Sequence, residues 1–155
     1  MKVFFATLLT IAILLAAGYW LANKLAAESR AMGVSSSLSN GLLWPCPSAV
    51  FNCVNSDSQP TDSHFIIPIS DPDGTRWAKL VATVDAMEGA ELVLSTDDYA
   101  YFTFTTKFLR FMDDVEFHNR PADRLIAVRS ASRVGKSDLG TNRRRIEDIR
   151  VALGL

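Results

Sequence analysis

Side chains with the potential for chemistry gather in two stretches of the sequence. The first, MDDVEF, places three carboxylates within four residues: Asp113, Asp114 and Glu116. The second lies near the C-terminus and carries the candidate ligand-binding residues, which are Arg129, Ser130, Ser132, Arg133, Asp138, Asn142, Arg143 and Arg145. Guanidinium groups bind carboxylates and phosphates through paired hydrogen bonds. The second stretch therefore predicts an anion-binding surface, and the first stretch offers it an acidic partner within the fold.

The arginines at 143–145 pose an electrostatic problem. They are expected in the first turn of the last helix, where the helix dipole disfavours positive charge. An anionic ligand could bind there, because a helix N-terminus offers free N–H groups beside the guanidinium groups. Alternatively, the MDDVEF carboxylates or Asp138 could pair with these arginines inside the fold. We favour the internal pairing, since it satisfies both charge clusters without an added partner.

The three carboxylates do not form a convincing metal or catalytic site. Side chains alternate between the two faces of a strand, so Asp114 and Glu116 should share one face while Asp113 lies on the other. The three could not then surround one Ca²⁺ or Mg²⁺ ion. The sequence has no G-x-S-x-G motif, and nothing ties His64 or His118 to a serine nucleophile. We predict no metal and no cofactor, and the catalytic residues of any enzyme here stay unknown.

The chain has two cysteines, Cys46 and Cys53. A short loop closed by two cysteines is typical of a disulfide in an oxidising compartment. A metal site completed by His64 and His118 is one alternative, although the six residues between the cysteines exceed the usual spacing of a zinc knuckle. Free thiols are the other alternative. We favour the disulfide, which predicts that the domain lies outside the cytoplasm, in the periplasm if the organism is a bacterium.

An uncharged stretch, Val3 to Ala22, opens the chain. As a helix its 20 residues would reach about 30 Å, the hydrocarbon thickness of a bilayer. Tyr19 and Trp20 near its end suit the membrane interface. The apolar core of a secretory signal is shorter, so we predict a retained single-pass anchor over residues 1–27 and keep a cleaved signal as the alternative.

The remaining sequence predicts a tether and one domain. Residues 28–41 are small and polar, with several serines, and are expected to form a flexible tether. Residues 42–155 are enough for a single domain with its own core. The net charge of −1, from 16 Lys and Arg against 17 Asp and Glu, gives no reason to expect nucleic acid as a partner.

Periodicity predicts the elements of the domain. Asp71 and Pro72 signal a helix start, and apolar residues recur at helical spacing from there to Met87. Strands are expected over 91–96, 99–108, 111–117 and 124–130, and in the second of these Phe102, Phe104 and Phe108 should share one face. A last amphipathic helix follows. This order predicts an α+β fold, a mainly antiparallel sheet with helices packed on one face, preceded by one N-terminal transmembrane helix.

Three motifs together resemble the domain-of-unknown-function family 1499. They are CPS and NCV at the two cysteines, an F-x-DDVEF-type strand, and RSASR-x-G-x-SDLG-x-NR-x-RIE near the C-terminus. The resemblance covers the chain from about Leu42 to the end. It implies an envelope or organelle-membrane domain, and it supplies no agreed activity or catalytic residues.

These observations predict a membrane-anchored extracytoplasmic domain that is not an enzyme. We expect it to bind a protein partner or a small anionic ligand through the polar surface between Arg129 and Arg145. The alternative is an envelope-associated enzyme, for example a hydrolase.

Overall fold

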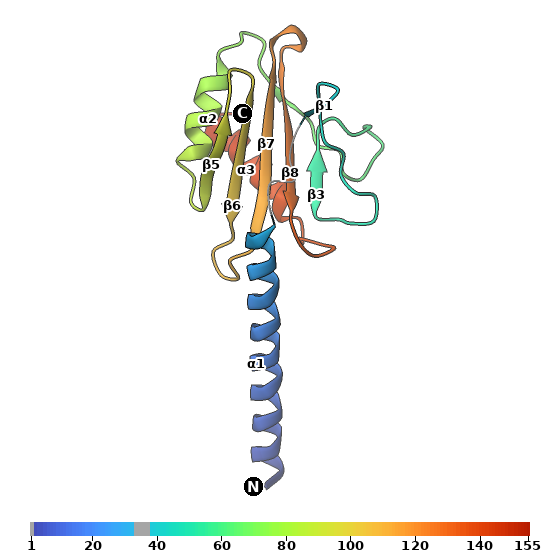
Figure 1. Ribbon diagram of the computed structural model, residues 1–155, viewed down its shortest axis with the longest axis vertical. Coiled ribbons are helices and arrows are strands. Elements are labelled where there is room, and N and C mark those ends of the chain that lie inside the picture. Colours follow the sequence, from blue (N-terminus) through green and yellow to red (C-terminus); the bar gives the residue numbers. More distant parts are fainter. Residues whose placement is uncertain (1, 33–37) are drawn as a thin grey trace.

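A long N-terminal helix stands away from an α+β domain in the computed structural model, which describes residues 2–32 and 38–155 (Figure 1). The helix α1 runs from Lys2 to Ala31. Its part Val3–Ala31 is long and apolar enough to cross a membrane, and it is a candidate membrane span. The single apolar N-terminal helix predicted from the sequence is thus present, and it supports a membrane location.

The domain is built on a six-stranded antiparallel sheet with the strand order β3-β8-β7-β6-β5, and β4 also pairs with β8. Two short strands form a separate hairpin, and a 3₁₀ helix, η1 (Pro121–Asp123), joins β7 to β8. The strands are β1 (Leu38–Ser39), β2 (Leu42–Leu43), β3 (Cys53–Asn55), β4 (Ile69–Ser70), β5 (Ala90–Ser95), β6 (Tyr99–Thr105), β7 (Met112–Arg120) and β8 (Leu125–Ser132).

Two helices cover one face of this sheet, α2 (Arg76–Asp85) and α3 (Thr141–Leu153) (Figure 1). Phe102 on β6 and Phe117 on β7 meet edge to face beneath them, with ring centroids 6.1 Å apart. Burying such apolar side chains stabilises the fold by about 1.5–3 kcal/mol each. The core under the helices includes Leu80, Val84, Phe104, Val115, Val128, Ile146 and Ile149. The predicted α+β fold with helices on one face of an antiparallel sheet is confirmed.

The opposite face of the sheet, which we call the second face, is more polar. A small apolar cluster of Leu43, Tyr99, Tyr101 and Ala127 lies on it. The disulfide between Cys46 and Cys53 ties the loop before β3 to the edge of the sheet. The predicted disulfide is therefore present in the structure.

Three sequence predictions need correction or placement. The helix predicted from Asp71 begins at Arg76, and the Asp71 carboxylate instead accepts a hydrogen bond from the Arg76 N–H at 3.1 Å. The strand predicted to reach Phe108 ends at Thr105, because the chain turns there, so Phe108 lies in a loop. The segment 28–41, expected to be a tether, contains the last turn of α1 and the strand β1, and residues 33–37 of it lie outside the described residues.

Candidate functional site

The two polar stretches singled out from the sequence meet in the middle of the sheet. The registers of β7 with β8 and with β6 set Glu116 opposite Arg129 and Tyr101, and Asp114 opposite Ala131. Asp114 and Glu116 therefore face the second face, whereas Asp113 faces the helices. The predicted division of the three carboxylates between two faces is confirmed.

On the helix side, Asp113 forms a buried ion pair with Arg145 of α3, with 2.5 Å between Oδ2 and Nη2. Arg145 also donates to the Ser130 hydroxyl at 2.9 Å and to the Asn142 side-chain oxygen at 2.6 Å. Its guanidinium group lies over the ring of Phe104 at 4.8 Å. The internal pairing that we favoured is confirmed for Arg145, and it neutralises a cation placed unfavourably in the first turns of α3.

On the second face, Glu116 pairs with Arg129 at 2.6 Å and accepts a hydrogen bond from the Tyr99 hydroxyl at 2.8 Å. Burial raises the pKa of the Glu116 carboxyl above its usual range, although Arg129 and Tyr99 both act to lower it. Next to this pair, the hydroxyl of Tyr101 donates to Asp114 at 2.5 Å. Burial, and then the hydrogen bond to Asp114, raise the pKa of Tyr101.

Other candidate residues form hydrogen bonds at the N-terminus of α3. Asn142 donates to the Ser132 hydroxyl at 2.9 Å and to the Asn52 carbonyl at 2.9 Å. The Asp138 carboxylate accepts from the N–H groups of Gly140 and Asn142, at 2.9 and 2.7 Å, which is the role of a helix cap.

Arg143 is exposed and lies away from the carboxylates of MDDVEF. It donates to the backbone carbonyls of Ser63 and Phe65, at 3.1 and 2.8 Å. Of the predicted ligand-binding arginines, Arg129, Arg145 and Arg133, which pairs with Asp114, have buried carboxylate partners, and Arg143 has backbone partners. That these residues bind a ligand stays a prediction.

The hydrogen bonds of His64 and His118 go to residues other than the candidate serines, Ser130 and Ser132. His64 contacts the Asp62 carboxylate and the Val50 carbonyl, each at 2.7 Å. The Nδ1 of His118 accepts a hydrogen bond from Arg120 at 3.0 Å. Burial, and then the charge of Arg120, lower the pKa of His118. Within residues 2–32 and 38–155, no three His, Cys, Asp or Glu side chains gather as a metal site would require.

Arg133 joins the sheet to the N-terminal helix. It pairs with Asp114 at 2.8 Å and donates to the Tyr101 hydroxyl at 2.9 Å. The same guanidinium group donates to the carbonyls of Ser29 and Met32, at 3.1 and 2.7 Å. These carbonyls are at the C-terminal end of α1, where the helix leaves acceptors unpaired and where its dipole favours a cation. The buried network of ion pairs and hydrogen bonds on the second face therefore extends to the C-terminal end of α1.

Other contacts fix the same end of α1. The Ser29 hydroxyl oxygen accepts a hydrogen bond from the Met112 N–H at 3.0 Å. Arg30 donates to the Arg110 carbonyl at 2.8 Å. Ser29 and Ala26 are almost completely buried, at 0 and 1 % exposure, although α1 is otherwise exposed along most of its length. The last two turns of α1 are therefore packed against the domain.

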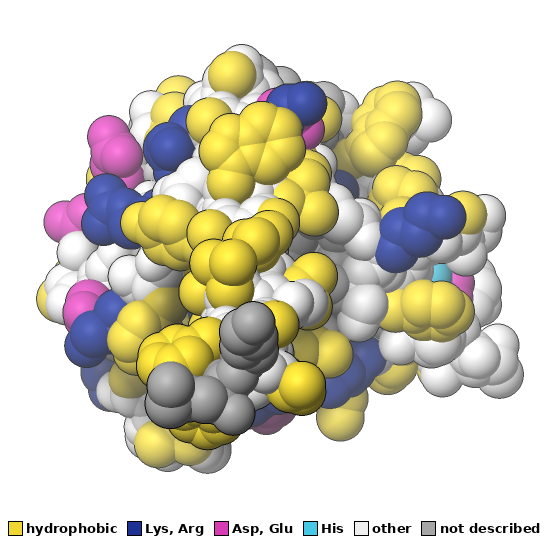
Figure 2. All heavy atoms as spheres, turned by 90° about the horizontal axis from the view of Figure 1, so that it is seen from below, with side chains coloured by type: hydrophobic (Ala, Val, Ile, Leu, Met, Phe, Trp, Pro, Cys, Tyr) yellow, Lys and Arg dark blue, Asp and Glu magenta, His cyan; other side chains and the backbone are white. Residues whose placement is uncertain are grey.

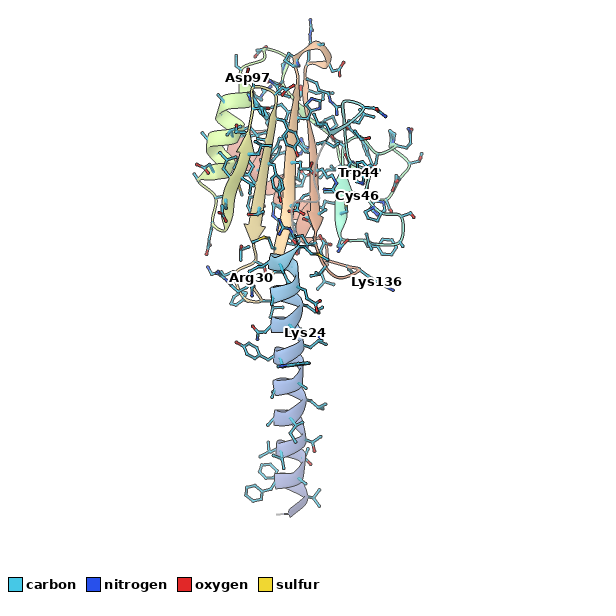
Figure 3. All side chains as sticks on the ribbon, in the orientation of Figure 1. Lys24, Arg30, Trp44, Cys46, Asp97 and Lys136 are labelled. Atoms are coloured by element: carbon cyan, nitrogen blue, oxygen red, sulfur yellow. A yellow bond between two sulfur atoms is a disulfide. The ribbon has the colours of Figure 1, made fainter. Side chains whose placement is uncertain are left out.

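Two loops surround the point where α1 leaves the domain, and we call this region the helix-exit end. One loop, residues 106–111, joins β6 to β7, and the other, residues 133–140, joins β8 to α3 (Figure 1). Arg30 and Lys136 both lie at this end, on opposite sides of α1 in Figure 3, and Asp97 lies at the opposite end of the domain. Figure 2 looks along α1 at this end, so the apolar side chains of α1 stand in front of the domain, and Lys and Arg side chains lie around them.

The loops expose large apolar side chains. Phe108 is 89 % exposed and Leu139 is 86 % exposed. The cations Lys107, Arg110 and Lys136 are exposed in the same two loops. Sequence reasoning missed these residues, because Phe108 was assigned to a strand and Leu139 belonged to a stretch interpreted only through its polar residues. The sequence offered one signal, the aromatic and basic run KFLRF.

A cavity of about 360 Å³ lies between the two loops. Its lining includes Phe108, Leu109 and Phe111 from the first loop and Val134 and Leu139 from the second. A groove of about 460 Å³ adjoins the cavity and shares with it the residues Thr106, Lys107 and Thr141.

The fold and these contacts define a class of protein: a single α+β domain carried on one candidate membrane-spanning helix, with charged pairs buried on both faces of its sheet. The chain belongs to the family described as "Protein of unknown function (DUF1499)", which matches residues 43–153. The suspected family is thus confirmed, and it is one without a characterised activity. No curated protein and no solved structure matches this chain.

Proposed function

We propose that this chain is a membrane-anchored, extracytoplasmic domain that is not an enzyme and that binds the surface of an anionic bilayer with its helix-exit end. Residues 1–27 are the anchor, residues 42–155 the domain, and residues 28–41 the segment between them. The anionic ligand expected from the sequence is then the lipid surface itself. The observation that supports the proposal is the packing of α1 against the domain, because a membrane-spanning α1 would then hold the two loops beside the bilayer.

The position of the buried residue Ala26 along α1 supports contact between the domain and the bilayer. If Val3 to Ala22 spans the hydrocarbon, Ala26 lies four residues further, or about 6 Å along the helix axis. The headgroup layer adds about 5–7 Å to each side of the hydrocarbon. Because Ala26 is covered by other residues, part of the domain reaches into the headgroup layer.

The chemistry of the loops fits that layer. Exposed Phe108 and Leu139 lose contact with water when they enter the interface, which is favourable for apolar surface. Each of the cations Lys107, Arg110 and Lys136 contributes about 1 kcal/mol near an anionic surface. The disulfide between Cys46 and Cys53 supports the oxidising side of the membrane.

Spin labels on the full-length chain in lipid nanodiscs test the proposal. The native cysteines are joined in a disulfide, so a nitroxide can be attached selectively to Leu139→Cys, and to Asp97→Cys as the control at the opposite end (Figure 3). We expect the label at 139 to be more accessible to oxygen, which concentrates in the membrane, than to a water-soluble nickel complex. The label at 97 should show the reverse. If both labels are equally accessible to the nickel complex, the domain does not touch the bilayer and the proposal is wrong.

A further inference from the structure

We infer that the cavity between the two loops takes one acyl chain of an anionic membrane lipid, and that the adjoining groove holds the headgroup of that lipid. This inference rests on the proposed function, because the cavity must face the bilayer to receive a chain from it.

The walls of the cavity suit a hydrocarbon chain. Phe108, Phe111, Val134 and Leu139 supply apolar surface from both loops. A volume of about 360 Å³ lies in the range of sites that bury small, mainly apolar ligands. The cavity is therefore large enough for part of one acyl chain and too small for a folded partner.

Apart from Lys107, which lies where the cavity meets the adjoining groove, the polar side chains in the lining have partners in the protein. Asp113 is paired with Arg145, Ser132 accepts a hydrogen bond from Asn142, and Asp138 caps α3. A polar ligand would form few new hydrogen bonds with groups that already have partners. An apolar ligand displaces water from the apolar walls without breaking any hydrogen bond of the protein.

The backbone holds the two loops in an uncommon conformation. Arg110 and Leu139 have positive φ angles of 59° and 54°, which are rare for residues other than glycine and asparagine. Leu139 also keeps an apolar side chain almost fully exposed. Strained backbone conformations cluster at functional sites. The strain at Leu139 thus presents an apolar group at the rim of the cavity.

The adjoining groove has the charge that an anionic headgroup requires. It is lined by the cations Lys107, Arg110, Arg144 and Arg145, and by the acids Glu88 and Asp148. Arg145 is neutralised by Asp113, and Lys107 lies 3.2 Å from exposed Glu88. An exposed ion pair of this kind is weak, so Lys107 remains available to another anion. The groove touches the cavity at Thr106, Lys107 and Thr141, which would place headgroup and chain of one lipid side by side.

Photocrosslinking of the full-length chain in nanodiscs tests the inference. The nanodiscs contain phosphatidylcholine with a minority of phosphatidylglycerol that carries a diazirine in one acyl chain. After irradiation, adducts are located by peptide mass spectrometry. We expect adducts on Phe111 and Val134, inside the cavity, as well as on α1. Phosphatidylcholine carrying the same diazirine chain should label these two residues several-fold less.

Substitutions test whether labelling of Phe111 depends on the cavity or on the general proximity of the domain to the bilayer. Val134→Phe fills the cavity and should reduce labelling of Phe111 several-fold, while Val151→Phe, at an exposed position on α3, should leave it unchanged. Ser137→Phe obstructs the exposed rim of the cavity and gives the same test if Val134→Phe does not fold.

A charge variant tests the headgroup groove. The double substitution Lys107→Gln with Arg110→Gln should reduce the preference for phosphatidylglycerol, by about fivefold for each cation removed. A preference that the double variant leaves unchanged would overturn the assignment of the headgroup to this groove.

The outcomes distinguish the two proposals. If adducts form on Phe108 and Leu139 but not on Phe111 or Val134, the domain touches the bilayer and the acyl-chain inference is wrong. If adducts form on α1 alone, both the inference and the proposed function are wrong. Equal labelling by the two lipids would overturn the headgroup assignment.

Discussion

Substitution of Arg133 by glutamine should unfold the domain more easily and release α1 from it. The guanidinium group is buried, with 5 % of the side chain exposed, and its partner Asp114 is 1 % exposed. Removing one partner of such a pair leaves an uncompensated buried charge and costs about 3–5 kcal/mol. Since single domains are stable by about 5–15 kcal/mol, this is a large share of the free energy of unfolding.

The matched control is another ion pair of the same chain. Lys107 and Glu88 lie 3.2 Å apart, but their side chains are 68 and 79 % exposed, so Lys107→Gln should cost only about 0–1 kcal/mol. Both variants can be compared by urea unfolding of the full-length chain in nanodiscs, followed by tryptophan fluorescence, in which Trp44 and Trp77 report on the domain and Trp20 lies in α1. A loss below about 1 kcal/mol for Arg133→Gln would refute the argument that burial makes this pair critical.

A double variant separates the stability of the domain from the packing of α1. Arg133→Met with Asp114→Asn removes both charges, so most of the stability lost in Arg133→Gln should return. The hydrogen bonds from Arg133 to the carbonyls of Ser29 and Met32 remain lost. Hydrogen exchange at the Met112 amide, which donates to the Ser29 hydroxyl, should then be faster than in the wild type. Unchanged exchange would mean that Arg133 does not hold α1 in place.

Three further predictions follow from particular contacts. Burial and Arg120 lower the pKa of His118 below its usual 6.5, so the contribution of His118 to stability is fully present above pH 6.5 and is lost as the pH falls below that value. In His118→Gln, the midpoint of thermal unfolding should therefore depend less on pH below 6.5, and a pH profile identical to that of the wild type would refute this prediction. Leu139→Asn should raise the free energy of unfolding by about 1 kcal/mol, because asparagine tolerates a positive φ; lower stability would contradict the assignment of strain. Replacing both Cys46 and Cys53 by serine should lower the free energy of unfolding by about 2–3 kcal/mol, and a reducing agent should then have no further effect on the double variant, whereas it destabilises the wild type.

The division of the acidic residues between two faces was predictable from the sequence. A strand alternates its side chains by its own geometry, so the spacing of Asp113, Asp114 and Glu116 was sufficient. The partner of each carboxylate was not predictable, because it depends on how β7 aligns with β6 and β8. A shift of one residue in that register would move Glu116 away from Arg129 and Tyr101.

The ends of elements were harder to predict than their types. Alternation continues formally from Phe104 through Phe108, yet the strand stops at Thr105, because the Thr106 N–H donates to the Phe111 carbonyl and closes a loop. Likewise, Asp71 carries a typical signal for a helix start, but its carboxylate reaches the N–H of Arg76, and the helix begins there. Both outcomes depend on contacts across several residues that a periodic pattern does not contain.

By itself, the sequence determined that an apolar helix precedes one α+β domain, that its cysteines can pair, and that the chain resembles its family. These properties depend on length, periodicity and local spacing, which the chain carries without reference to its fold. Only the tertiary structure decided that Arg133 joins Asp114 to the end of α1, and that loops 106–111 and 133–140 line one cavity. These contacts join residues up to about a hundred positions apart, and their geometry depends on strand register and on the packing of α1, which no local pattern specifies.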